Sequence, residues 1–244
     1  MWDKNKKHTR IKLCLFEYLE AAYEASNCGA DALGFHILKS NKENWTDKVQ
    51  KFRNIINYLP ENIEKVLLID YDLTIVADCM NAVAFNSIQL YPDCSSDEIH
   101  ELRIKINRPI KILKVISAQS HENSPPDFDD FILKYKDSVD AFLLDSCREG
   151  GSGEIADLSV CSKIVNASPI PVFLAGGLNS KNVALAISSV SPFGVDVETG
   201  VSTYVKGIGL IKNLAKCYEF VSEVKHIDHI LNRKIVNKPV NDNL

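Results

Sequence analysis

The chain has 244 residues, of which 45% are hydrophobic and 25% charged, and its formal net charge at pH 7 is −4. This composition is typical of a globular protein with a buried core, and the net negative charge argues against nucleic-acid binding. No apolar run approaches the roughly 20 residues that span a bilayer, and the basic start MWDKNKKHTR does not resemble a secretory signal, so no membrane association is expected.

The hydrophobic pattern switches repeatedly between apolar runs typical of buried strands and amphipathic stretches typical of helices. In chain order, strands are predicted at residues 11–16, 30–37, 64–70, 86–91, 110–117, 140–146, 171–177 and 194–200. The alternating helices are predicted at residues 19–29, 46–59, 73–84, 95–106, 127–139, 158–167, 180–190 and 207–224. Boundary signals support the second helix, since Thr46 is a good N-cap and Pro60 stops it.

Eight consecutive strand–helix units in about this length predict an α/β protein with one domain, a (β/α)₈ TIM barrel over residues 11–230. A doubly wound open sheet also alternates strands and helices and is the alternative architecture. Residues 1–10 and 231–244 are polar and have no partner in this scheme, so we expect a polar tail at each end.

The active sites of such barrels lie at the carboxyl ends of the strands. The two-residue period of the first strand places Cys14 on the face opposite Leu13 and Leu15, which aims its thiol into the barrel mouth. Lys12 and Phe16 share the face of Cys14. A lone buried cysteine is more often a small core residue, so the catalytic and structural interpretations both stay open.

The last three strands carry further polar candidates. Asp145 ends an otherwise apolar strand, where a carboxylate is costly unless it is used in chemistry or caps the next loop. Asp196 and Glu198 face inward on the last strand by the same alternation. Glycine clusters at 150–153 and 176–177 follow the sixth and seventh strands, and fit either tight turns or an anion held by backbone N–H groups.

The cysteines and histidines show no metal-ligand pattern. Seven cysteines are present without a CxxC pair, and the six histidines form no constellation, so no metal site is predicted. An odd number of unpaired cysteines is typical of reduced thiols, and we expect a cytoplasmic protein.

With these residues in view, the chain resembles the phosphoribosylanthranilate isomerase family along its whole barrel. DAFLLDS…GGSG is similar to the family's LLD followed by GGTG, FLAGGLNSKNV to its LAGGLNPENV, and PFGVDVETGV to its VDVSSGV. ADALGF, IQL and KLC are weaker matches. The resemblance implies a (β/α)₈ barrel that performs an Amadori rearrangement in tryptophan biosynthesis without metal or cofactor.

The resemblance also implies individual roles. Asp145 is implied as the general acid that opens the ribose ring, and Cys14 as the general base that takes the C2′ proton. A base of this kind needs a partly ionised thiol, and Lys12 is one candidate source of the positive field. Asp196 is implied to contact the sugar hydroxyls. The implied phosphate-binding residues are Gly151, Gly153, Gly176, Gly177, Thr199 and Gly200.

The match departs from the family at the aglycone end. After the cysteine the family has glycine, and here Leu15 stands there. The family arginine that pairs with the anthranilate carboxylate is absent after the second strand, which offers Lys39 or Lys42 instead. Tyr91 and a proline replace His-Gly after the fourth strand, and Ser202 replaces an acidic residue after the eighth.

The predicted function is isomerisation of N-(5-phosphoribosyl)anthranilate to 1-(2-carboxyphenylamino)-1-deoxyribulose 5-phosphate. The expected partner is therefore a small phosphorylated sugar-amine. Two alternatives remain: a non-catalytic barrel that binds a phosphosugar or a partner, and an isomerase for a different N-linked phosphoribosyl compound.

Overall fold

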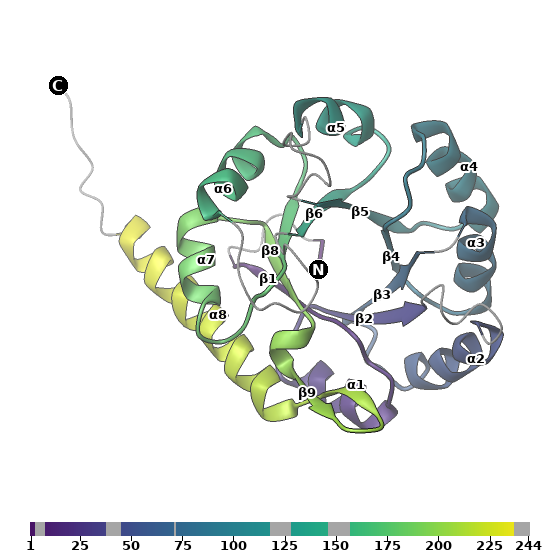
Figure 1. Ribbon diagram of the computed structural model, residues 1–244, viewed down its shortest axis with the longest axis horizontal. Coiled ribbons are helices and arrows are strands. Elements are labelled where there is room, and N and C mark those ends of the chain that lie inside the picture. Colours follow the sequence, from purple (N-terminus) through teal and green to yellow (C-terminus); the bar gives the residue numbers. More distant parts are fainter. Residues whose placement is uncertain (3–7, 38–44, 71, 118–127, 146–156, 237–244) are drawn as a thin grey trace.

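The computed structural model describes residues 1–2, 8–37, 45–70, 72–117, 128–145 and 157–236. Within these residues, eight parallel strands close into one barrel with helices around it (Figure 1). The strands are β1 (Arg10–Leu13), β2 (Ala32–Ile37), β3 (Glu64–Ile69), β4 (Ser87–Leu90), β5 (Lys111–Ser117), β6 (Ala141–Asp145), β7 (Val172–Ala175) and β8 (Gly194–Val197). Because β1 pairs with β8 as well as β2, the sheet has no edge, and the open-sheet alternative is wrong.

In the part of the chain that the structure describes, seven helices connect successive strands, and an eighth follows β8. They are α1 (Leu19–Asn27), α2 (Trp45–Ile56), α3 (Leu73–Ala82), α4 (Ser96–Ile106), α5 (Phe128–Tyr135), α6 (Leu158–Ala167), α7 (Val183–Val190) and α8 (Leu214–Val236). Side chains accept helix N-terminal N–H groups at α3, where Asp72 bonds two of them, and at α4, where Ser95 and Glu98 form a capping box. α2 begins at Trp45, so the predicted N-cap Thr46 lies inside the helix.

The strand alternation sorts the side chains into two apolar clusters. Outward residues such as Leu13, Leu144 and Val195 join the helices in the larger cluster. Inward residues such as Cys14 and Leu143 form a smaller cluster inside the barrel, as the two-residue period predicted. Burial of each large aliphatic side chain contributes about 1.5–3 kcal/mol, so this sorting fixes the register of every strand.

The amino-terminal residues are not all part of a polar tail. Met1 and Trp2 pack against the interior cluster. The rings of Trp2 and Phe173 pack edge to face, with their centroids 6.0 Å apart. The indole Nε1 donates to Glu64 Oε1 at 2.8 Å. Figure 1 shows the amino terminus inside the ring of strands. The first residues therefore cover one end of the barrel, because its apolar interior would otherwise meet water there.

The segment after β8 differs most from the prediction. A 3₁₀ turn, η2 (Thr199–Val201), leads into a hairpin of β9 (Ser202–Val205) and β10 (Gly209–Lys212), where the last helix was expected to start. Gly207 and Gly209 have φ of 84° and 101°, positive values that glycine adopts readily and that suit the hairpin turn.

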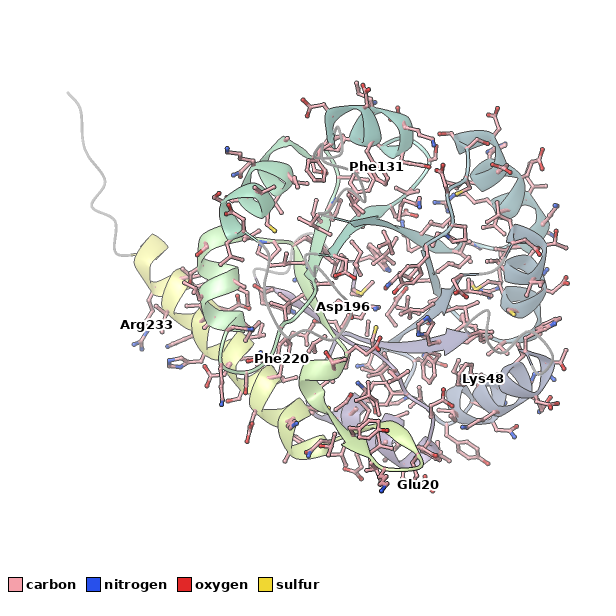
Figure 2. The ribbon with its side chains drawn as sticks, in the orientation of Figure 1. Glu20, Lys48, Phe131, Asp196, Phe220 and Arg233 are labelled. Carbon is pink, nitrogen blue, oxygen red and sulfur yellow. The ribbon has the colours of Figure 1, made fainter. Side chains whose placement is uncertain are left out.

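The last helix is correspondingly displaced along the chain. α8 runs from Leu214 to Val236, so residues 231–236, expected in the carboxyl-terminal tail, are helical. Its buried Phe220 faces the barrel (Figure 2). Ile227 and Leu231 continue the apolar stripe onto the core. Near the end of the stripe, Asp228 accepts hydrogen bonds from the backbone and hydroxyl of Thr9. These contacts explain why the helix extends past the predicted boundary.

Candidate active site

A cavity opens at the carboxyl ends of the strands, where the fold predicts the active site. Residues from β3, β4, β6, β7 and β8 and from the loops after β7 and β8 line it. They are Leu68, Gln89, Tyr91, Leu143, Asp145, Ala175, Gly176, Gly177, Leu178, Asp196, Val197, Glu198 and Thr199. The structure thus brings Asp145, Asp196 and the GG pair together at one mouth, as the sequence predicted.

Cys14 lies in a buried cluster with Lys12 and Asp196. The β1–β8 register sets Lys12 directly beside Asp196, and all three side chains are at most 7% exposed. The Cys14 thiol donates to Asp196 Oδ1 at 3.1 Å, while Lys12 Nζ donates to the sulfur and lies 2.9 Å from Asp196 Oδ2. Figure 2 shows Asp196 within the ring of strands.

The backbone around Cys14 explains its position. Leu15 has φ of +69°, a left-handed conformation that costs a non-glycine residue about 1–2 kcal/mol. This turn ends the alternation, so Phe16 packs outward in the helix-side core, and the prediction that it faces inward is wrong. Across from the sulfur, Gly34 leaves the space that Cys14 fills: a Cβ at Gly34 would lie 2.6 Å from Sγ and 2.9 Å from Leu68 Cδ1.

The electrostatics of the cluster do not favour a free thiolate. Burial raises the pKa of Cys14 well above its ordinary value, and the neighbouring carboxylate of Asp196 raises it further, against the opposing effect of Lys12. Burial lowers the pKa of Lys12, but Asp196 and Cys14 outweigh that effect and the net direction is upward. Lys12 is thus placed where the sequence suggested, and its effect on the pKa of Cys14 is opposed by burial and by Asp196.

Asp145 and Glu198 add acidic groups to the same mouth. Asp145 ends β6, next to Ser117 on β5 and Ala175 on β7. Burial raises the pKa of Glu198; Lys212 opposes this, and Asp196 and Asp145 add to it. A carboxyl group in such surroundings holds its proton more tightly than a carboxyl in water.

The loop after β7 is shaped by its glycines. Gly176 and Gly177 have φ of 90° and 64°, a region that glycine adopts without steric cost. The side chains of Asn179 and Asn182 both donate to the Gly177 carbonyl, at 3.2 and 2.9 Å, which ties the turn back onto itself. The turn is therefore rigid, and its carbonyl is directed into the protein rather than toward a ligand.

The start of η2 packs closely on this loop. A Cβ at Gly200 would lie only 2.0 Å from the Leu178 carbonyl oxygen, so a larger residue cannot take its place without moving backbone. Thr199 at the first position of η2 lines the cavity with Gly176 and Gly177. The two loops thus form one surface at the mouth. Gly151 and Gly153, the other predicted phosphate ligands, lie outside the described residues.

Sequence reasoning missed Lys212, because it placed that residue in a helix. Lys212 ends β10, and its Nζ donates to the Glu198 carbonyl at 2.9 Å and to the Ser202 hydroxyl at 2.8 Å. Burial lowers its pKa, while the nearby acidic groups of Cys14 and Glu198 oppose the effect. The hairpin therefore holds the backbone of the loop after β8 in place.

The opposite side of the mouth carries the Gln89 amide, which sequence reasoning also missed, and the rings of Tyr91 and His36. Gln89 Nε2 donates to Tyr91 Oη at 2.9 Å, and the Tyr91 and His36 rings are stacked with an interplanar angle of 16°. Burial lowers the pKa of His36 to about 4, so the imidazole is neutral near pH 7. The weak IQL match was the only sequence signal for Gln89.

The predicted cations Lys39 and Lys42 lie outside the described residues. Among the described ones, Lys48 and Lys51 of α2 form ion pairs with Glu17 at 2.8 and 2.9 Å, near the end of β2. The described residues contain no group of three or more side chains arranged to hold a metal ion. None of the helices described is long and apolar enough to cross a membrane.

Comparison with known proteins agrees with the geometry. The family model for N-(5′-phosphoribosyl)anthranilate isomerase matches residues 11–223. N-(5′-Phosphoribosyl)anthranilate isomerase 2 of Methanosarcina mazei is 33% identical over 224 residues, covering 89% of this chain and 94% of the relative. The Staphylococcus aureus isomerase is 32% identical over 196 residues, covering 79% and 88%.

Solved structures are also similar over most of the chain. The isomerase of Pyrococcus furiosus superposes with a TM-score of 0.70 at 26% identity, covering 90% of this chain and 100% of that one. A phosphoribosylanthranilate isomerase in complex with reduced 1-(o-carboxyphenylamino)-1-deoxyribulose 5-phosphate gives 0.67 at 25% identity, with 89% and 99% covered. Together with the barrel-mouth cysteine and aspartate, these matches establish that the chain belongs to the N-(5′-phosphoribosyl)anthranilate isomerase family.

Proposed function

We propose that this protein converts N-(5-phosphoribosyl)anthranilate into 1-(2-carboxyphenylamino)-1-deoxyribulose 5-phosphate, an Amadori rearrangement of tryptophan biosynthesis. The observation that supports the proposal is that Asp145 of β6 lines the same cavity as Asp196, and that Asp196 is hydrogen-bonded to the buried thiol of Cys14 on β1. An isomerase of this kind needs two proton-transfer groups on different sides of one sugar. Free thiols at the six described cysteines fit a cytoplasmic enzyme.

The phosphate end of the substrate binds over the loops after β7 and β8. Gly176, Gly177 and Thr199 line the cavity, and Gly200 follows Thr199 in the chain. We propose that their backbone N–H groups bind the phosphate, with Gly151 and Gly153 from the loop after β6 completing the cradle. The close approach of Gly200 to the neighbouring loop supports a site built for backbone contacts.

Asp145 acts first, as the general acid. Its proton passes to the furanose ring oxygen, the bond between C1′ and that oxygen breaks, and the nitrogen lone pair forms an iminium at C1′. Such a transfer contributes about 10²–10⁴-fold.

Cys14 acts second, as the general base. The thiol proton passes along the 3.1 Å hydrogen bond to Asp196, and Lys12 stabilises the thiolate that remains. The thiolate takes the C2′ proton of the iminium, and the resulting enol-amine tautomerises to the ketone. Burial and Asp196 raise the pKa of Cys14, so we propose that the positive charge of the iminium beside the sulfur favours the thiolate during the reaction.

The remaining substrate contacts are proposed from the same arrangement. Asp196 lines the cavity next to Cys14, where its carboxylate also reaches the sugar hydroxyls. Lys39 and Lys42 are proposed to approach the anthranilate carboxylate from the loop after β2. A lysine there makes a point-charge contact rather than the bidentate contact of an arginine.

The proposal is tested by mixing the protein with freshly made phosphoribosylanthranilate and following the loss of its fluorescence. Turnover is expected, and Cys14→Ala and Asp145→Asn should each abolish it, whereas the exposed surface variant Asp137→Asn should keep it. Saturable phosphosugar binding without turnover would establish the binding-protein alternative instead. Turnover only after the aglycone is exchanged would establish an isomerase for another phosphoribosyl compound.

A further inference from the structure

One buried polar atom at the mouth has no hydrogen-bond partner among the described residues. Gln89 is 1% exposed, and its Oε1 accepts no hydrogen bond from any residue that the structure describes. The same side chain lines the cavity between Leu68 and Tyr91. Buried amide oxygens in folded proteins are nearly always hydrogen-bonded, so an exception in a cavity calls for an explanation.

The other end of the amide is held firmly. Gln89 Nε2 donates to Tyr91 Oη at 2.9 Å, and the Tyr91 ring is stacked on His36. Tyr91 is 37% exposed, so its ring borders the mouth while its hydroxyl reaches inward to the amide. Tyr91 therefore acts as a positioning residue that fixes the direction of Gln89.

An unused buried acceptor is unfavourable for stability. The oxygen gives up its water on folding and receives no hydrogen bond in return, so an apolar side chain of similar shape would stabilise this place at least as well. A donor from a bound molecule removes the cost. The orphaned oxygen therefore points to a ligand group that donates a hydrogen bond.

The barrel order indicates which group this is. β4 lies four strands from β8 in the closed ring, so Gln89 faces the mouth from the side opposite Asp196. A substrate whose phosphate sits over β7 and β8 crosses the mouth between Cys14 and Asp145 and brings its C1′ end toward β4. The donor at C1′ is the nitrogen that joins the sugar to the aromatic ring.

We propose that Gln89 Oε1 accepts a hydrogen bond from this nitrogen and stabilises the iminium. The proposal rests on the proposed isomerase function. When the ring opens, the N–H group becomes cationic, and a hydrogen bond from a cationic donor is about twice as strong as a neutral one. The interaction thus strengthens along the reaction, which makes Gln89 a catalytic residue rather than a uniform binding group.

The test uses Gln89→Met, which keeps the length of the side chain and removes the amide. The single-turnover rate with phosphoribosylanthranilate should fall about 10- to 100-fold. The dissociation constant of reduced 1-(o-carboxyphenylamino)-1-deoxyribulose 5-phosphate should change by a smaller factor, because the nitrogen of this secondary amine carries no iminium charge. The unfolding midpoint should stay the same or rise. Tyr91→Phe should lower the rate in the same direction with little change in binding, and exposed Gln50→Met is the control.

The outcomes separate the two proposals. If the unsubstituted protein turns over and Gln89→Met keeps its rate within about threefold, the role of Gln89 is refuted while the isomerase function stands. A lower rate accompanied by a lower unfolding midpoint and an equal loss of binding would mark Gln89 as merely structural. If the unsubstituted protein shows no turnover, the isomerase function fails and the proposed role fails with it.

Discussion

Asp196→Asn should turn the Cys14 thiol into a thiolate near neutral pH. The substitution keeps the side-chain shape and removes the negative charge that lies 3.1 Å from Sγ. Lys12 then has the sulfur as its only hydrogen-bonded anionic partner among the described residues. Because the buried ammonium needs a counter-charge, the lowest-energy arrangement becomes a pair of Lys12 and thiolate.

The magnitude follows from the geometry. At 3.1 Å and an effective dielectric constant of about 20, the repulsion between thiolate and carboxylate is about 5 kcal/mol, and the substitution removes it. Loss of the buried pair with Lys12 costs about 3–5 kcal/mol while the thiol stays protonated. Ionisation of the thiol recovers part of this cost, so the stability loss should shrink as the pH rises.

The contribution of Cys14 to folding stability should therefore depend on pH with opposite sign in the unsubstituted protein and in Asp196→Asn. In the unsubstituted protein the pKa of Cys14 is raised above its ordinary value of 9.0, so its contribution to stability is present below that value and lost above it. In Asp196→Asn the folded-state pKa falls below the ordinary value. Its contribution is then present above the ordinary value and lost as the pH falls through the lowered one.

Ultraviolet absorbance of the thiolate, alkylation rates and denaturant unfolding between about pH 6 and pH 9 measure these effects. Burial raises the pKa of the other described cysteines, so they contribute little thiolate in this range; they are Cys28, Cys79, Cys94, Cys161 and Cys217. The double variant Cys14→Ala/Asp196→Asn supplies the background. Equal thiolate absorbance in Asp196→Asn and this double variant, with parallel pH profiles of stability, would refute the reasoning.

Three further predictions concern packing, the cradle and pH. Gly34→Ala should destabilise the fold by about 1–3 kcal/mol and slow turnover, because its Cβ would lie 2.6 Å from Cys14 Sγ; unchanged denaturant unfolding and rates would contradict this. Gly200→Ala should raise the KM for the substrate and the inhibition constant of inorganic phosphate about tenfold, with a smaller effect on kcat, because its Cβ would meet the Leu178 carbonyl oxygen. An unchanged inhibition constant of phosphate would contradict this prediction. The unsubstituted protein should lose stability as the pH rises above about 9, because burial raises the pKa of Cys79 to about 12 and of Cys161 to about 11; a flat unfolding profile would argue against it.

Local pattern was sufficient for most of the barrel. Continuous apolar strands and amphipathic helices repeat eight times, and each predicted strand overlaps the corresponding barrel strand. The errors fall where local signals compete. Residues 207–224 carry a helical pattern, but Gly207 and Gly209 favour a hairpin turn first, and α8 then continues to Val236 because its apolar stripe extends along the core.

Whether a side chain faces into or out of the barrel could be predicted only for residues with extended, strand-like backbone. The two-residue period correctly placed Cys14 and Leu143 inside the barrel. It failed at Phe16, because Leu15 adopts a left-handed backbone that no propensity assigns to leucine. The glycine that makes room for the thiol, Gly34, has meaning only once β2 lies beside β1.

The electrostatics of the site depend on contacts that the sequence does not display. The proximity of Lys12 to Cys14 follows from a spacing of two residues, but the pairing with Asp196 arises because closure of the barrel sets β1 against β8. Burial first, and that carboxylate second, raise the pKa of the thiol against the effect of Lys12. The unpartnered oxygen of Gln89 likewise emerges only from a complete account of hydrogen bonds in the described interior. Which charged groups face each other, and which buried polar atoms lack a hydrogen bond, are decided only when the barrel closes. The chemistry of its mouth therefore has to be argued from the structure.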